Sequence, residues 1–314
     1  MKRTIKTLQA VAICALIPLA GAFSFDLKDF LSSRENLEKL EKIGKSVNDT
    51  SDSLSAIQKA TETITPADSY EIGRTVSASI LKKYELLNAP KATAYLNKIC
   101  KSLALNSDTP VIYKDYCVAI LKSDEINAIS SCGGHIFVTQ GLLRCCDSED
   151  AVAAVIAHEM AHIQLEHAVA AIKADRTKNA IGSTVSTASG FVDSYSGMSE
   201  KDKFLFDFLA GSNVAVMNRL FETGYPKEQE YKADELALRL MLNTGYDPNA
   251  MIDMLELIDK HHKENASDTG WEKTHPKPAD RIKKAKAFIA KNKPTGKDKS
   301  VRLARFSDNI NGKI

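Results

Sequence analysis

The feature that most restricts the fold is a long apolar run with three ionisable side chains inside it. Residues 151–157 read Ala-Val-Ala-Ala-Val-Ile-Ala, and Ala161, Ile163 and Leu165 continue the run. A run of this length predicts a buried helix, and the acidic residues within 147–150 are typical of a helix start. We therefore expect one long helix over about residues 149–174.

The three ionisable side chains form the string His158-Glu159-Met160-Ala161-His162. Histidines four residues apart on a helix share one face, so both imidazoles can bind the same cation. Zinc suits them, because it accepts nitrogen and oxygen ligands and keeps one position for water in hydrolases. Zinc lowers the pKa of that water to about 7, and Glu159 is placed to accept its proton.

The alternative is a core helix without a metal. Burying three ionisable groups within one helical turn costs several kcal/mol unless they are compensated. We therefore predict one zinc ion per chain, with His158 and His162 as ligands and Glu159 as general base.

A third ligand has to come from another segment. Glu230 and Asp234 lie one turn apart on a predicted helix at 227–243. A carboxylate ligand and a second carboxylate that holds the far nitrogen of a ligand histidine are a common pair at metal sites. Spacing alone leaves Glu228 and Glu235 as competitors. His167, five residues after His162, is expected to face away from the metal, at the surface or beside a ligand.

The first 22 residues have the pattern of an export signal. Lys2, Arg3 and Lys6 precede an apolar stretch, and Ala-Gly-Ala at 20–22 matches a cleavage site. We predict that residues 1–22 are a signal peptide and that the protein is periplasmic or secreted. An uncleaved membrane anchor is the alternative, although the stretch is shorter than the roughly 20 residues that span a bilayer.

Charge and cysteine content follow from this signal. The chain has 42 basic and 40 acidic residues, and removing three basic ones leaves 39 and 40, which is nearly neutral. That balance gives no support for nucleic-acid binding. Five cysteines remain, and export to an oxidising compartment predicts disulfides among them.

Periodicity indicates one predominantly helical domain with a small sheet, of the α+β class. We predict a helical arm at 23–64, which either packs on its own domain or contacts an envelope or membrane-associated partner. A domain at 65–292 and a flexible basic tail at 293–314 are expected to follow. Within the domain, helices are expected at 67–87, 91–104, 201–222, 227–243 and 277–291, and β-type runs at 111–113, 118–121 and 135–139. Residues 177–198 are expected to form a loop or weak helix, and residues 245–248 a turn.

The order of several motifs resembles metallopeptidase family 48, which includes the HtpX-like and BepA-like bacterial proteases and the CAAX prenyl endopeptidases. The resemblance covers about residues 67–292. Its motifs are the His158–His162 string, Glu230-x-x-Ala233-Asp234, Thr274-His275-Pro276, Arg281-Ile282, Asn127-Ala128 with the glycine-containing stretch 133–143, and Gly245-Tyr246-Asp247-Pro248.

The resemblance implies a zincin-like (gluzincin) fold in which Glu230 is the third zinc ligand and Asp234 supports a ligand. It places His275 and Arg281 in the catalytic site with Glu159. His275 then acts as a reversible latch on the metal or as an oxyanion donor, the alternative being a turn residue. Arg281 stabilises the oxyanion or forms an ion pair. The resemblance also implies that an edge strand holds extended substrate by backbone pairing, with residues Gly134, His135, Ile136, Phe137 and Val138.

Two functions of different kinds are compatible with these motifs. The first is a zinc endopeptidase that hydrolyses unfolded or misassembled envelope proteins. The second is a chaperone-like protein-binding factor whose zinc site is latched and seldom cleaves. Glu159 favours the endopeptidase, because a pure binding protein has no use for a general base there. A structural zinc protein is disfavoured, since only three protein ligands are indicated.

Overall fold

The computed structural model describes residues 63–182, 213–265, 275, 278–292, 294 and 299–314. The predicted signal, almost all of the predicted arm, residues 183–198 of the predicted loop and residues 201–212 of a predicted helix lie outside the described part. The described residues belong to two units, and residues 63 and 173–182 are those described of the smaller one. All that follows concerns the larger unit, which contains residues 64–172 and 213–314.

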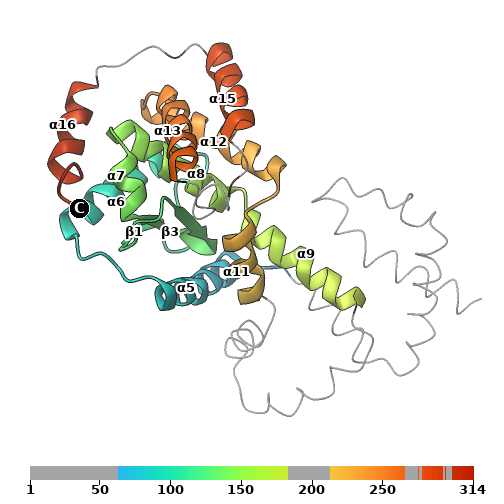
Figure 1. Ribbon diagram of the computed structural model, residues 1–314. Coiled ribbons are helices and arrows are strands. Elements are labelled where there is room, and N and C mark those ends of the chain that lie inside the picture. Colours follow the sequence, from blue (N-terminus) through green and yellow to red (C-terminus); the bar gives the residue numbers. More distant parts are fainter. Residues whose placement is uncertain (1–62, 183–212, 266–274, 276–277, 293, 295–298) are drawn as a thin grey trace, which may run out of the picture. The chain divides into compact units, whose positions relative to one another are not determined.

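The larger unit is mainly helical and has one three-stranded sheet, as the α+β prediction requires (Figure 1). The helices before the sheet are α5 (Pro66–Lys83) and α6 (Pro90–Leu105). The strands are β1 (Cys117–Leu121), β2 (Ala128–Ser131) and β3 (His135–Thr139), with a short 3₁₀ turn, η3 (Cys132–Gly134), before β3. The later helices are α7 (Gln140–Cys145), α8 (Glu149–Gln164), α9 (His167–Gly182), α11 (Asn213–Thr223), α12 (Lys227–Thr244), α13 (Asn249–Asn265), α15 (Pro278–Asn292) and α16 (Ser300–Asn309).

The sheet separates two hydrophobic clusters, because successive strand residues point to opposite faces. In β3, Ile136 and Val138 face a large cluster with residues of α6, α8, α12 and α13. Phe137 lies between them in sequence and faces a smaller cluster with residues of α5, α11 and the first turns of α9. Every residue of α8 from Glu149 to His162 is buried, so this helix crosses the larger cluster. A helix enclosed on all sides is what its apolar sequence predicts.

The sheet order is β1-β3-β2, and this corrects the predicted edge strand. β3 pairs in parallel with β1 and antiparallel with β2, so its backbone groups are occupied on both sides. Gly134, His135, Ile136, Phe137 and Val138 are therefore not at an edge. The outer side of β1 is covered as well, since the Asn97 side chain bonds both backbone groups of Val118 at 2.8 and 2.9 Å. In the described chain, β2 is the strand whose outer side has no strand partner.

Two further segments differ from the sequence prediction. Residues 111–113 form an exposed-to-half-buried loop rather than a strand. The helix expected over 149–174 is broken: α8 ends at Gln164, and α9 begins at His167. Glu166 between them has φ of 52°, a left-handed conformation that a continuous helix does not contain. The chain therefore changes direction directly after the second histidine of the metal motif.

A close backbone approach between α5 and η3 explains the glycines near the sheet. A Cβ atom on Gly73 of α5 would lie 1.9 Å from the carbonyl oxygen of Cys132. Gly134 has φ of 99°, and its Cβ would lie 2.4 Å from the carbonyl oxygen of Asp115. Only glycine fits both positions without moving backbone.

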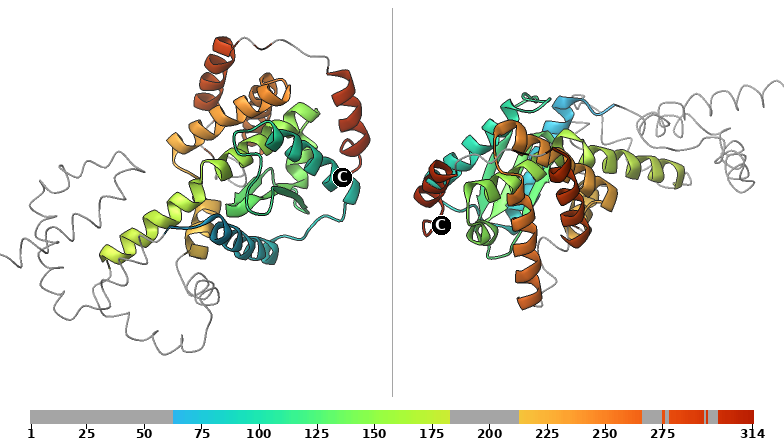
Figure 2. Two further views of the ribbon diagram at one scale, coloured as in Figure 1. Left: turned by 180° about the vertical axis from the view of Figure 1, so that it is seen from behind. Right: turned by 90° about the horizontal axis from the view of Figure 1, so that it is seen from above.

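The C-terminal stretch that we expected to be flexible contains α16, which packs on α6 and the start of α8 (Figure 2). Arg302 lies 2.8 Å from the Asp150 carboxylate, and Arg305 lies 2.8 Å from the Glu149 carboxylate. Both acidic side chains are almost fully buried in the first turn of α8. The basic residues of this stretch thus neutralise carboxylates that the metal-binding helix buries at its N-terminus.

The five cysteines are all free thiols, so the prediction of disulfides was wrong. Cys100 and Cys146 lie in the larger hydrophobic cluster and Cys132 in the smaller one. Burial raises the pKa of Cys100 and of Cys132 to about 12, and a protonated thiol is a poor nucleophile.

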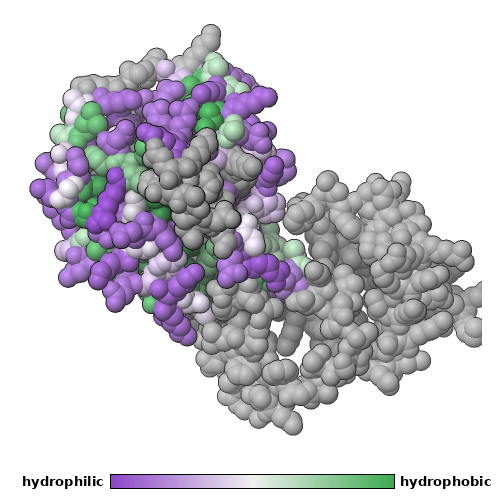
Figure 3. Space-filling view, viewed as in Figure 1, coloured by the Kyte–Doolittle hydropathy of each residue, from purple (hydrophilic) through white to green (hydrophobic). Residues whose placement is uncertain are grey.

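Hydrophilic side chains dominate the face of the described chain in Figure 3, with hydrophobic side chains in small groups between them. Among the described helices, none combines the length and the apolar composition needed to cross a bilayer.

The contact between α16 and α8 generates a stability prediction. Arg302→Ala should lower the free energy of unfolding by about 1–3 kcal/mol, because it leaves the buried Asp150 carboxylate without its charged partner. Arg239→Ala is the matched control: its ion pair with Glu235 is more than half exposed on both sides, so the loss should be about 1 kcal/mol or less. Urea denaturation of both variants measures the difference. Equal losses would mean that α16 does not stabilise the start of α8.

Candidate metal centre

Three side chains of the site come from one turn of α8. His158 and His162 point their Nε2 atoms at one another, 3.1 Å apart, as the four-residue spacing requires. Both imidazoles and Glu159 are at most 2% exposed. Alanines surround them on the helix, so few other side chains compete for the space.

A carboxylate from a second helix completes the group. Glu230 lies in the first turns of α12, which packs along α8 through the fully buried Ala233 and Ala237. Its two oxygens lie 3.4 Å from His158 Nε2 and 3.4 Å from His162 Nε2. Burial alone would raise the pKa of Glu230, but the neighbouring histidines hold it well below its ordinary value. The carboxylate is therefore ionised, as a metal ligand must be.

His275 extends into the same group from the segment before α15. Its Nδ1 lies 2.8 Å from a Glu230 oxygen and 3.4 Å from His158 Nε2. Its Nε2 lies 3.9 Å from the Glu159 carboxylate. Burial lowers the pKa of His275, which favours the neutral imidazole that binds metals. His158, His162, Glu230 and His275 each offer one ligand atom, and these four atoms lie within 4.8 Å of one another.

These donors fit zinc on two observations. Tetrahedral bonds of about 2.0–2.1 Å place two nitrogens about 3.3 Å apart, close to the 3.1–3.4 Å separations among the histidine and glutamate atoms. In addition, one oxygen of Glu159 and one of Glu230 are buried without a hydrogen-bond partner in the described chain. Unpartnered buried carboxylate oxygens are costly, and a cation beside them removes that cost. All four donors are nitrogen or oxygen atoms, the set found in catalytic zinc sites.

An ion pair fixes the orientation of His158. Its far nitrogen, Nδ1, lies 3.0 Å from Asp234, and Arg281 binds the same carboxylate at 2.6 and 2.8 Å. Burial alone would raise the pKa of Asp234, but Arg281 and His158 hold it well below its ordinary value. Asp234 thus remains ionised and holds His158 with Nε2 directed at the other ligands. Arg281 is 0% exposed, and this contact supports the ion-pair alternative for it.

His162 is held by different side chains, which the sequence pattern did not reveal. His167 lies with its Nδ1 3.0 Å from Nδ1 of His162 and is buried, because the break after α8 turns it back towards the motif. Burial and the neighbouring His162 lower the pKa of His167 to about 3, so its neutral ring can accept the His162 proton. Of the two places expected for His167, the surface or a position beside a ligand, the structure shows the second, since His167 is buried against the far nitrogen of His162.

Tyr225, in the turn before α12, stacks on the other side of His162. The ring centroids are 4.3 Å apart, and the planes meet at 23°. Burial, with Cys132 and Glu159 nearby, raises the pKa of the Tyr225 hydroxyl well above its ordinary value, so it remains a donor. The sequence marks Tyr225 only as part of a Gly-Tyr-Pro break. Nothing in that pattern indicates its contact with a ligand.

The comparisons with known proteins agree with this geometry. The sequence model of peptidase family M48 matches residues 90–289. The chain is 25% identical over 205 residues to a beta-barrel assembly-enhancing protease of Escherichia coli, and 27% identical over 197 residues to the mitochondrial metalloendopeptidase OMA1 of Schizosaccharomyces pombe. It is 26% identical over 198 residues to the metalloprotease LoiP of Escherichia coli. These alignments cover 64%, 63% and 62% of this chain, and 39%, 53% and 70% of the respective relatives.

The ligand assignment predicts a clear order of metal content. Glu230→Ala should lose most bound zinc, because it removes a fully buried carboxylate from the group. Glu228→Ala and Glu235→Ala remove exposed carboxylates of the same helix and should keep it. Metal analysis of the three purified variants gives the comparison, and equal loading in all three would remove Glu230 from the ligand set.

The contact between His167 and His162 predicts a smaller effect. His167→Ala should weaken zinc binding by about 10–100-fold, since a ligand that loses its orienting hydrogen bond typically loses that much. His135→Ala is the control, because His135 contacts the Cys132 carbonyl instead of the metal group. Titration with a competing chelator measures both affinities. An unchanged affinity in a folded His167→Ala protein would contradict the orienting role.

Proposed function

Because the chain belongs to peptidase family M48, we propose that it is a zinc endopeptidase that hydrolyses peptide bonds of misfolded or misassembled envelope proteins. The observation that carries the proposal is the buried, unpartnered Glu159 oxygen beside the group formed by His158, His162 and Glu230. A structural zinc site has no use for an additional buried carboxylate beside the ligands, one oxygen of which accepts no hydrogen bond in the described chain. A hydrolase needs one as its general base.

His158, His162 and Glu230 would hold zinc, which would act as a Lewis acid on the peptide carbonyl and would make a water molecule a nucleophile near neutral pH. Glu159 accepts the proton of the attacking water and passes it to the leaving amine. Asp234 keeps the proton of His158 on its far nitrogen, so the nitrogen that faces the metal stays free to bind. Arg281 keeps Asp234 ionised in that role.

The outer side of β2, which has no strand partner in the described chain, is proposed to align the substrate, in place of the β3 edge expected from the sequence. The amide of Thr139 donates to the carbonyl of Asn127 at 3.0 Å. By antiparallel alternation, Ala128 and Ser130 then direct their backbone groups away from β3. An extended peptide pairs with such groups by strand addition. Unfolded segments expose their backbone for this pairing, which supports unfolded proteins as substrates.

The cellular role rests on the relatives and on the predicted signal. One relative is named for enhancing beta-barrel assembly, so we propose quality control of envelope proteins as the role here. Residues 1–22 support export to the periplasm or outside the cell, with an uncleaved anchor as the alternative. The arm at 23–64 remains a candidate contact for a membrane-associated partner. The chain spans 39% of that relative's length, so these assignments concern the peptidase region that both share.

A second candidate function follows from the position of His275. Its Nδ1 lies among the ligand atoms at 2.8–3.4 Å, where it can occupy the position that water needs. A protein in that state binds unfolded chains without cleaving them, as a chaperone-like factor does.

The general-base assignment predicts that Glu159→Gln keeps its zinc and its fold but loses nearly all hydrolysis of unfolded casein, because the ligands remain and the base is gone. Release of peptides from casein, with and without a chelator, measures the activity. Substantial hydrolysis by the zinc-loaded variant would contradict the mechanism.

His275→Ala separates the two roles of His275 by the sign of its effect. If His275 latches the metal, removing it should raise casein hydrolysis. If it donates to the oxyanion, the rate should fall by about 10²–10³-fold. Both rates are compared at equal zinc content. An unchanged rate would leave His275 as a residue of the turn.

A further inference from the structure

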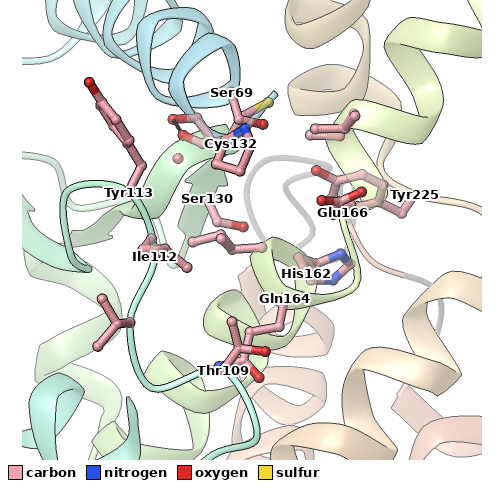
Figure 4. A pocket seen from close by; sticks show the side chains of 17 residues that line it. Ser69, Thr109, Ile112, Tyr113, Ser130, Cys132, His162, Gln164, Glu166 and Tyr225 are labelled. Carbon is pink, nitrogen blue, oxygen red and sulfur yellow. Dashed lines mark hydrogen bonds between the residues drawn. The ribbon is translucent and has the colours of Figure 1, made fainter. Parts of the chain in front are cut away.

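A cavity of about 280 Å³ opens beside the metal group and has no role in the mechanism above (Figure 4). The loop at 109–113 forms one wall, and Ser130, Cys132 and the rest of the β2–η3 junction form another. The end of α8 and the start of α9 form the third wall, together with Tyr225. In Figure 4, Ile112 and Tyr113 lie across the cavity from His162 and Tyr225.

The cavity adjoins the proposed metal group at His162, which is both a candidate ligand and part of the wall. Ser130, another wall residue, belongs to β2, the strand proposed to align the substrate. The Ser130 side chain is 4% exposed, and its hydroxyl has no hydrogen-bond partner in the described chain. A buried hydroxyl without a partner costs free energy. A peptide group of a bound substrate is placed to satisfy it.

The walls are chemically suited to an uncharged side chain. Ile112, Ile163, Ala168 and Val169 contribute apolar surface, and the lining contains no lysine or arginine. Its one carboxylate, Glu166, is exposed and repels an acidic group. An acidic side chain would lose its hydration there without gaining a cationic partner, whereas an apolar side chain gains by leaving water.

The size of the cavity and its rim limit the ligand further. The volume of about 280 Å³ lies at the lower end of the range of about 300–1,000 Å³ that is typical of small-molecule pockets, and it is large enough for a single large side chain. At the rim, Val111 is 70% exposed and Tyr113 is 52% exposed. Adjoining exposed apolar side chains at a cavity are typical of a binding surface. Val111 and Tyr113 would contact the substrate residues next to the one whose side chain enters the cavity.

We propose that this cavity binds an aliphatic or aromatic side chain of the residue next to the cleaved bond, and so directs cleavage to apolar segments of unfolded proteins. The proposal rests on the proposed function, since it names the substrate class of that site. Apolar segments are buried in folded proteins and exposed in unfolded ones. The cavity thus gives the enzyme a chemical basis for selecting unfolded chains.

The test begins with unfolded casein, whose cleaved bonds are identified by mass spectrometry. A cleaved sequence is then made as an unstructured peptide, with Leu, Phe, Ala, Lys or Asp at each position flanking the bond. At one of the two positions, kcat/KM should be at least about tenfold higher for Leu or Phe than for Asp. Similar rates for all five residues at both positions, or the highest rate for Lys, would overturn the proposal.

A charge variant ties the preference to the cavity. Ile112→Lys places a cation in the wall and should lower kcat/KM for Leu and Phe peptides about tenfold while raising it for Asp peptides. Leu105→Lys is the control, since Leu105 is 62% exposed at the end of α6 and outside the lining. This variant should still have a higher kcat/KM for the Leu and Phe peptides than for the Asp peptide. An unchanged order in a folded, zinc-loaded Ile112→Lys enzyme would contradict the assignment.

Peptide binding keeps this test separate from the proposed hydrolysis. Fluorescence anisotropy with the Glu159→Gln variant measures affinity for the same peptides without turnover. If the wild type cleaves no casein, the peptides are made instead from one unstructured casein segment, with the same five residues at its centre. Should the Leu and Phe peptides then bind more tightly than the Asp peptide, and Ile112→Lys remove that difference, the cavity assignment stands and the peptidase assignment fails. If the Leu, Phe and Asp peptides bind equally, the cavity assignment fails whatever the cleavage result.

Discussion

The buried ion pair between Arg281 and Asp234 is the interaction on which the geometry of the metal centre depends. Arg281 is 0% exposed and Asp234 3% exposed, so both charges have lost their hydration. A buried ion pair often stabilises a protein no more than apolar residues of similar size. Its role here is therefore better explained by the orientation it gives His158 than by a contribution to stability. Asp234 holds His158, and the pair thereby connects α8, α12 and α15 at the ligand group.

The two histidines proposed as ligands, His158 and His162, are held by chemically different partners. An ionised carboxylate contacts the far nitrogen of His158, and this raises the basicity of the ring. A neutral imidazole contacts the far nitrogen of His162, and the ring of Tyr225 stacks on it. His162 is therefore oriented without a carboxylate at its far nitrogen, and the negative charge beside it is that of Glu230 at Nε2. The break after α8 makes this possible, because an unbroken helix would carry His167 away from His162.

The metal helix could be predicted well from the sequence because its signal is local. A buried apolar helix seldom carries two histidines four residues apart unless they bind a metal, and α8 begins at Glu149 as expected. Glu230 is harder to predict as a ligand, since spacing alone left Glu228 and Glu235 as competing candidates. The family resemblance was needed to choose among the three. The structure supports that choice, because Glu228 and Glu235 are exposed whereas Glu230 is 0% exposed.

The errors concern features that depend on distant contacts. An apolar strand such as β3 has the same pattern in the centre of a sheet as at its edge, and β2 is too short and serine-rich to be recognised. The left-handed Glu166 has no glycine or proline to mark it, so the helix break was missed. The basic C-terminal stretch gave no sign that Arg302 and Arg305 have buried carboxylate partners in α8.

The binding of one zinc ion to His158, His162 and Glu230, with His275 within reach, is the claim on which the proposed chemistry depends. X-ray absorption at the zinc edge of the purified protein tests it most directly, because it reports the atoms bound to the metal. We expect nitrogen and oxygen neighbours at about 2.0–2.1 Å, including two or three imidazoles, and no sulfur. Sulfur at about 2.3 Å, or fewer than two imidazoles, would contradict it.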